Sequence, residues 1–123
     1  MTPVIAIVDD NEPFRHATMS FIRSLEYAVL QFASAEAFLK SSRLHDADCL
    51  IADVQMPGMN GIELQHELIA QGHHLPIIFV TAVPEMKALA QALTSGAIGF
   101  LAKPFSDEML ITCLNEALGA RSI

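Results

Sequence analysis

Five short apolar runs recur along the chain, and segments whose apolar residues repeat with the period of a helix lie between them. Each run has four or five residues and is partly β-branched, which indicates strands. The predicted strands are residues 4–8, 28–32, 49–52, 77–80 and 98–101. Strict alternation of strand and helix with short connections favours a parallel sheet covered by helices on both faces, because each crossover returns the chain to the same edge.

Helix start and stop signals agree with this alternation. Asn11 or Glu12 is placed to cap a first helix with Pro13 in its first turn, and Asn60 is placed to cap a third. Gly72 falls where that third helix should end. With 123 residues and no repeat or linker, the sequence predicts one doubly wound α/β domain over residues 1–123.

Composition limits the class of protein. A 52% share of hydrophobic residues and a mean hydropathy of +0.40 exclude disorder. No apolar run approaches the roughly 20 residues of a membrane span, and residues 1–5 lack the pattern of a signal peptide. We expect a cytoplasmic protein with no membrane contact, in which Cys49 and Cys113 are reduced core thiols.

Charge argues against direct nucleic-acid binding. Fourteen acidic residues against seven basic ones give a formal charge of −7, and the basic residues do not cluster. We therefore expect any DNA contact to belong to another domain.

Polar side chains follow four of the five predicted strands, at the point where each strand ends. Asp9 and Asp10 follow the first, Asp53 the third, Thr81 the fourth and Lys103 the fifth. Ligands of open α/β sheets bind beyond the carboxyl ends of the strands, so these side chains should converge on one edge.

Three carboxylates close together repel one another and require a cation to remain ionised. Oxygen ligands favour Mg²⁺, and the sequence offers no Cys/His set for zinc. A metal, a carboxylate, a hydroxyl and an ammonium together suit phosphoryl transfer to an aspartate. Asp53 would accept the group, Asp9 and Asp10 would hold the metal, and Lys103 and Thr81 would contact phosphoryl oxygens.

Each of these residues has an ordinary structural interpretation when it is taken alone. Acids such as Asp9 and Asp10 favour the first turn of a helix, Thr81 is a common strand-end residue, and Lys103 could be a loop lysine before a proline. Their agreement at separate sites favours the functional interpretation.

The matching segments resemble the receiver domain of response regulators. They are Val8-Asp9-Asp10, Asp53-Val54-Gln55-Met56-Pro57 with Gly61, Val80-Thr81-Ala82, Gly96-Ala97, Phe100 and Lys103-Pro104-Phe105. The stretches MPGMNGIEL, LPIIFVTA and FLAKPF are most similar to receivers of FixJ-type transcription regulators. The resemblance spans essentially the whole chain, and no effector or DNA-binding domain is expected in it.

The resemblance implies a five-stranded parallel sheet of order 2-1-3-4-5 with five helices on two faces. It also implies two-component signal transduction. A sensor histidine kinase passes a phosphoryl group to Asp53 with Mg²⁺. The domain then changes its interaction face and so controls an output domain or partner that regulates transcription. Its only chemistry is on itself, so the domain is not a turnover enzyme.

The resemblance assigns further site roles. The backbone carbonyl of Gln55 joins the metal ligands, and the backbone N–H of Ala82 contacts the phosphoryl group beside Thr81. Phe100 turns inward on activation, although an aromatic residue in an apolar run is also ordinary core. The peptide bond between Lys103 and Pro104 is a candidate for the cis form.

A protein contact follows from the same resemblance. Phosphorylation-dependent homodimers would form through the fourth helix, fifth strand and fifth helix, about residues 86–118. From their positions in the sequence, Phe14 and Phe105 are expected to be packing residues, but with Arg15 they lie near the predicted site mouth, where a kinase would dock. Pro84 stiffens the loop after Thr81, where many relatives carry glycine.

Two other functions remain as alternatives. A Mg²⁺-dependent aspartate-nucleophile phosphatase would use a similar set of residues, but it characteristically carries an acid two residues after the nucleophile, where this chain has Gln55. A nucleotide- or flavin-binding domain would need a Gly-rich loop after the first strand, where this chain has Asp9-Asp10-Asn11-Glu12.

Overall fold

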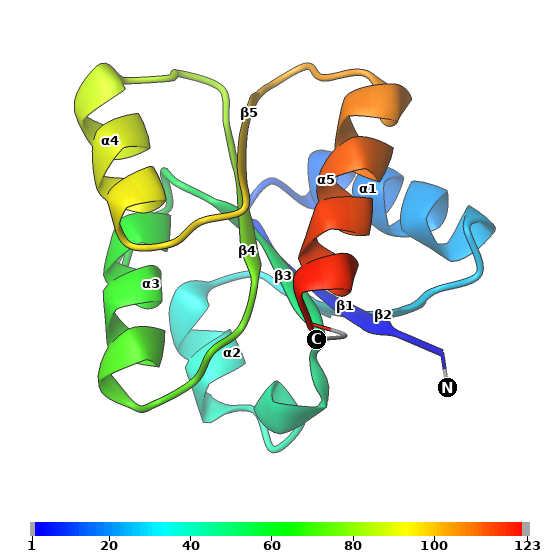
Figure 1. The fold of residues 1–123 in the computed structure, drawn as a ribbon, viewed down its shortest axis with the longest axis horizontal. Coiled ribbons are helices and arrows are strands. Elements are labelled where there is room, and N and C mark those ends of the chain that lie inside the picture. Colours follow the sequence, from blue (N-terminus) through cyan, green and yellow to red (C-terminus); the bar gives the residue numbers. More distant parts are fainter. Residues whose placement is uncertain (1, 122–123) are drawn as a thin grey trace.

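The apolar runs form one parallel sheet in the order β2-β1-β3-β4-β5, as predicted. The computed structural model describes residues 2–121, so residues 1, 122 and 123 of the predicted domain lie outside the described part (Figure 1). The strands are β1 (Val4–Val8), β2 (Ala28–Phe32), β3 (Cys49–Asp53), β4 (Ile77–Thr81) and β5 (Gly99–Ala102). The last three end one residue later than predicted, because Asp53 and Thr81 still pair with Val80 and Ala102 in the ladder.

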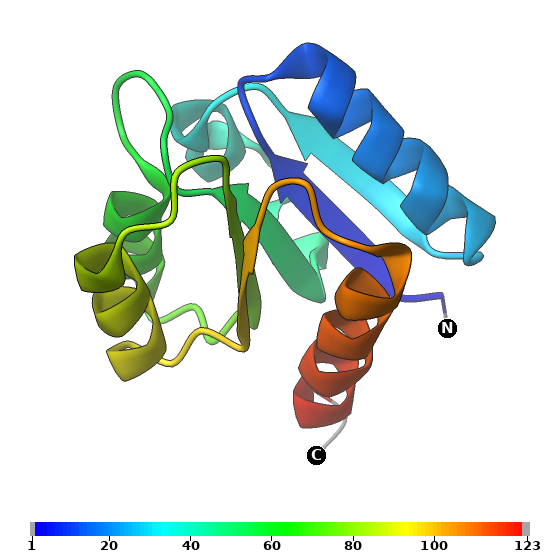
Figure 2. The same cartoon turned by 90° about the horizontal axis from the view of Figure 1, so that it is seen from above.

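Within the described part of the chain, five α-helices cover the two faces of the sheet (Figures 1 and 2). They are α1 (Glu12–Ser24), α2 (Ala35–Lys40), α3 (Gly61–Ala70), α4 (Met86–Thr94) and α5 (Asp107–Arg121), with a short 3₁₀ helix, η1 (Leu44–Asp46), before β3. Helices α1 and α5 lie against one face, and α2, α3 and α4 against the other. No helix within residues 2–121 has the length and apolar character needed to cross a membrane.

Side chains alternate along the central strands between two apolar layers. In β3, Leu50 and Ala52 belong to the layer under α2, α3 and α4, whereas Cys49 and Ile51 belong to the layer under α1 and α5. Every residue of β3 and β4 is buried. The sheet is thus covered on both sides, and the polar residues at the ends of these strands are held by a rigid support.

Helix caps place the first turns near the carboxyl ends of the strands. Asn11, not Glu12, caps α1, because its side-chain Oδ1 accepts a hydrogen bond from the backbone N–H of Phe14 at 3.0 Å. Asn60 and Glu63 form a reciprocal capping box at the start of α3. Gly72 follows α3 with a φ of 82°, which a glycine adopts without steric cost.

The two cysteines are free, as expected. Cys49 is buried in β3, and burial raises the pKa of its thiol to about 12. Cys113, on α5, is only partly buried, so it is less of a core residue than predicted.

Candidate functional site

Three carboxylates meet at the carboxyl ends of β1 and β3. Asp9 and Asp10 follow β1, and Asp53 is the last residue of the neighbouring β3. One carboxylate oxygen from each lies within 4.8 Å of those of the other two. Asp9 and Asp53 are buried and Asp10 is exposed, so the cluster opens to solvent on one side.

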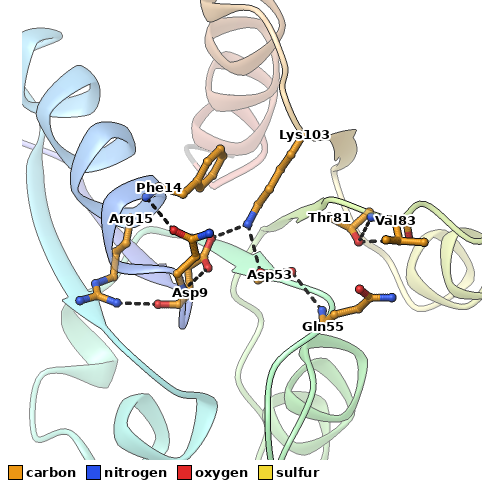
Figure 3. Close-up of polar contacts among 9 residues, drawn as sticks. Asp9, Phe14, Arg15, Asp53, Gln55, Thr81, Val83 and Lys103 are labelled. Carbon is orange, nitrogen blue, oxygen red and sulfur yellow. Dashed lines mark hydrogen bonds and ion pairs between the residues drawn. The ribbon is translucent and has the colours of Figure 1, made fainter.

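Lys103 supplies one positive charge to this cluster (Figure 3). Its Nζ donates to Oδ2 of Asp9 at 2.9 Å and to Oδ2 of Asp53 at 3.1 Å. The backbone N–H of Lys103 donates to the carbonyl oxygen of Thr81 at 2.7 Å, which fixes the loop after β5 beside β4. The Lys103–Pro104 peptide bond, which the resemblance singled out, is cis.

The electrostatics of the cluster leave negative charge in excess. Burial raises the pKa of the Asp53 carboxyl, and the charge of Asp9 acts in the same direction, while hydrogen bonds from the Gln55 backbone and from Lys103 oppose the rise. The cluster holds three carboxyl groups, and the ammonium of Lys103 contacts two of them, Asp9 and Asp53. A further cation would therefore favour the ionised form of Asp53.

The donor set fits Mg²⁺. Every side-chain ligand in the cluster is a carboxylate oxygen, and the exposed position of Asp10 leaves room for the water that Mg²⁺ retains. Gln55 lies two residues beyond Asp53, and its backbone N–H donates to Oδ1 of Asp53 at 3.0 Å. This bond holds the start of the loop after β3 close to the acidic cluster.

Comparison with known proteins identifies the family. The family of response regulator receiver domains matches residues 5–115 of the chain. The chain belongs to this family. Receiver domains are parts of two-component response regulators, as the resemblance predicted.

Similar proteins include transcription regulators. The receiver is 39% identical to the response regulator protein TmoT of Ectopseudomonas mendocina, over 94% of this chain and 52% of that protein. It is 36% identical to the transcriptional regulatory protein FixJ of Azorhizobium caulinodans, over 94% of this chain and 54% of that protein. The chain thus spans about half the length of these curated relatives.

Solved structures have the same fold. The response regulator StyR superimposes with a TM-score of 0.91 at 35% identity, over 99% of this chain and 62% of that one. The structure titled FixJ-N gives a TM-score of 0.86 at 31% identity, over 97% of this chain and 95% of that one.

Thr81 lies at the end of β4 in this receiver, but its hydroxyl is bonded to its own loop (Figure 3). Oγ1 of Thr81 donates to the carbonyl oxygen of Val83 and accepts from the Val83 N–H, both at 3.2 Å. Ala82 lies between them and is exposed. The sequence therefore placed Thr81 at the correct edge of the sheet but gave no information on the direction of its hydroxyl.

Phe100 is partly buried in β5 of the receiver. Its ring centroid lies 6.3 Å from that of Phe79, and it packs against the layer under α2, α3 and α4. This contact fits an ordinary core residue and leaves its role on activation a prediction.

Sequence reasoning missed two tertiary contacts, one at the site and one in the loop between β3 and α3. The ring of Phe14, which was expected only near the mouth, lies 4.1 Å from Nζ of Lys103. Glu36 of α2 accepts a hydrogen bond from the backbone N–H of Met59 at 3.2 Å, and backbone N–H groups lower the pKa of its carboxyl. The Glu36 contact joins positions 23 residues apart that no local pattern relates.

Proposed function

We propose that this receiver accepts one phosphoryl group on Asp53 from a sensor histidine kinase in the cytoplasm and thereby switches its interaction with an output domain or partner. The observation that supports this most strongly is the meeting of Asp9, Asp10, Asp53 and Lys103 at one end of the sheet. The family match and the transcription regulators among the relatives support the place of the domain in signal transduction.

In the proposed step, a carboxylate oxygen of Asp53 attacks phosphorus in line with the leaving group. A new O–P bond forms on Asp53, and the bond from phosphorus to the donor breaks, with its electron pair leaving on the kinase imidazole or on acetate from acetyl phosphate. Bound Mg²⁺, held by Asp9, Asp10, Asp53 and the Gln55 carbonyl, would neutralise charge on the phosphoryl oxygens.

Lys103 would contribute to the same step through its contact with Asp53. Its Nζ already contacts the Asp53 carboxylate at 3.1 Å, so an oxygen of the incoming group needs only a small shift to receive a charge-assisted hydrogen bond. The backbone N–H of Ala82 is proposed to contact another oxygen.

Thr81 would connect phosphorylation to a conformational change. Its single O–H proton is donated to the Val83 carbonyl oxygen, so that bond must break before the hydroxyl donates to the phosphoryl group, and the bond that it accepts from the Val83 N–H is lost when the side chain rotates away. Each such bond contributes about 0.5–1.5 kcal/mol net, and a bond to a doubly charged group is stronger. Phosphorylation would thus shift a two-state equilibrium toward the conformer with a released Val83 loop, and Phe100 is proposed to turn inward with it.

The face formed by α4, β5 and α5 is the proposed dimerisation surface after phosphorylation. Large apolar side chains are exposed on its two helices, including Met86 at 80%, Leu93 at 49% and Met109 at 50%.

DNA contact would occur only through an effector domain outside this chain. The phosphatase alternative has no support from the family match, and Gln55 supplies no acid.

Intact-mass spectrometry after treatment with acetyl phosphate and Mg²⁺ tests the proposal. We expect one phosphoryl group per chain, none with EDTA in place of Mg²⁺, and none on Asp53→Asn. Asp48→Asn, which changes a carboxylate that binds the N–H of Val4 instead, is the matched control. Steady turnover of a generic phosphate ester without accumulation of the phosphorylated protein would instead support the phosphatase.

A further inference from the structure

Three groups surround the ammonium of Lys103. Two are the carboxylates of Asp9 and Asp53, at 2.9 and 3.1 Å. The third is the ring of Phe14, whose centroid lies 4.1 Å from Nζ (Figure 3). The Lys103 side chain is only 12% exposed, so little water competes with these contacts.

The Phe14 ring is itself held in place from two sides. The backbone N–H of Phe14 donates to the cap residue Asn11 at 3.0 Å, which fixes the first turn of α1. Its ring meets that of Phe105 edge to face, with centroids 5.7 Å apart and planes at 81°. The ring therefore presents its face to the ammonium from a fixed position.

We propose that Phe14 is a positioning residue that holds Nζ of Lys103 beside Asp53 while the carboxylate contacts of Lys103 change. This inference rests on the proposed function, in which Asp9 and Asp53 become engaged by a cation and a phosphoryl group. Both carboxylates then become weaker partners for Lys103, and its flexible four-carbon chain would allow the ammonium to move into water. The ring attracts a cation through its quadrupole but binds neither Mg²⁺ nor phosphate.

The size of the effect follows from the strength of such a contact. Loss of the attraction between a partly desolvated cation and a phenyl ring changes a rate that depends on the position of the cation by roughly 2- to 30-fold. We expect Phe14→Leu, which keeps an apolar side chain but removes the ring, to lower the rate of Asp53 phosphorylation by acetyl phosphate by this factor. Phe14→Tyr keeps the ring face and should stay within about 2-fold of the wild type.

A spectroscopic measurement tests the contact independently of phosphorylation. The chain has three lysines, Lys40, Lys87 and Lys103, so a sample labelled with ¹³C at the lysine ε-carbon gives a simple NMR spectrum. Without Mg²⁺, the ε-CH₂ protons of Lys103 should be shifted upfield by the Phe14 ring relative to the other two lysines. The shift should disappear in Phe14→Leu and persist in Phe14→Tyr.

Phe21→Leu is the matched control, because Phe21 lies on the same helix and packs into the layer under α1 and α5. It should leave both the Lys103 shift and the phosphorylation rate unchanged. Thermal melting of each variant reports folding, and Phe14→Met replaces Phe14→Leu if the latter does not fold.

Wild-type Lys103 without an upfield shift, or a folded Phe14→Leu phosphorylated as fast as the wild type, would overturn the inference. A wild-type protein that is never phosphorylated would overturn the proposed function, while the NMR measurement would still report whether Phe14 holds Lys103.

Discussion

Gly61, the first residue of α3, lies so close to the backbone of Asp53 that a larger residue cannot fit without moving the site. A Cβ at position 61 would stand 2.4 Å from the carbonyl oxygen of Asp53 and 3.1 Å from the Cα of Val54. The first distance is about 1 Å short of ordinary van der Waals contact, and both neighbours are backbone atoms that cannot rotate away. Gly61→Ala should therefore displace the junction of β3 and α3.

Three effects set the change in the free energy of unfolding of Gly61→Ala. Overpacking of this kind costs about 1–3 kcal/mol, and displacement strains the 3.0 Å hydrogen bond from the Gly61 N–H to the Val54 carbonyl oxygen. Replacing glycine by alanine in a helix returns only about 0.5–1 kcal/mol. The strained hydrogen bond costs about as much as the alanine returns, about 0.5–1.5 kcal/mol. We therefore expect a net loss of about 1–3 kcal/mol, which corresponds to a melting temperature lower by about 4–12 °C for a domain of this size.

Gly119→Ala is the control, because Gly119 is exposed in α5 and, among the described residues beyond its own stretch of helix, no atom lies within 4 Å of an added Cβ. That variant should gain about 0.5–1 kcal/mol. Urea unfolding followed by circular dichroism measures both changes. A Gly61→Ala protein as stable as the wild type, or a Gly119→Ala protein that loses as much stability, would refute the steric argument.

Three further predictions concern buried polar groups. Because burial raises the pKa of Asp53, the contribution of this carboxyl to stability without divalent cations should be fully present below the ordinary Asp pKa of about 4 and be lost as pH rises through the raised value. Asp53→Asn should therefore melt higher than the wild type at pH 7 in EDTA, and a lower melting temperature would contradict this. Cys49 has a pKa raised to about 12, so it should not react with a thiol reagent at pH 8 until the protein unfolds, and rapid labelling of the native protein at Cys49 would contradict this. For the same reason, stability should decrease as pH rises from about 9. Gln65 is 1% exposed, and its Nε2 donates to the Ala92 carbonyl oxygen at 3.1 Å. Gln65→Glu should lower the free energy of unfolding by about 2–4 kcal/mol in chemical denaturation, because a carboxylate would face that oxygen. A loss below about 1 kcal/mol would count against this contact.

The sheet was predictable because its strands are short, apolar on both faces and separated by helices. The strand ends were less accurate, since Asp53 and Thr81 are polar yet still pair in the ladder. Helix α2 has only six residues, too few for a periodic pattern to define its limits.

The convergence of Asp9, Asp10, Asp53 and Lys103 was predictable because parallel strands place their carboxyl ends at one edge of the sheet. The direction of the Thr81 hydroxyl was not predictable, since it depends on which nearby group the hydroxyl bonds, and here that group is the Val83 backbone. The ring of Phe14 over Lys103 depends on how α1 and the loop after β5 pack, which is a tertiary property.

The acidic cluster is proposed to direct a phosphoryl group to one side chain, that of Asp53. Borohydride reduction of protein treated with acetyl phosphate and Mg²⁺ converts a phosphorylated aspartate to homoserine, and peptide mapping then locates the converted residue. We predict homoserine at position 53 alone, and only when Mg²⁺ was present. Conversion at Asp9 or Asp10, or at no position, would show that Asp53 is not the phosphoryl acceptor.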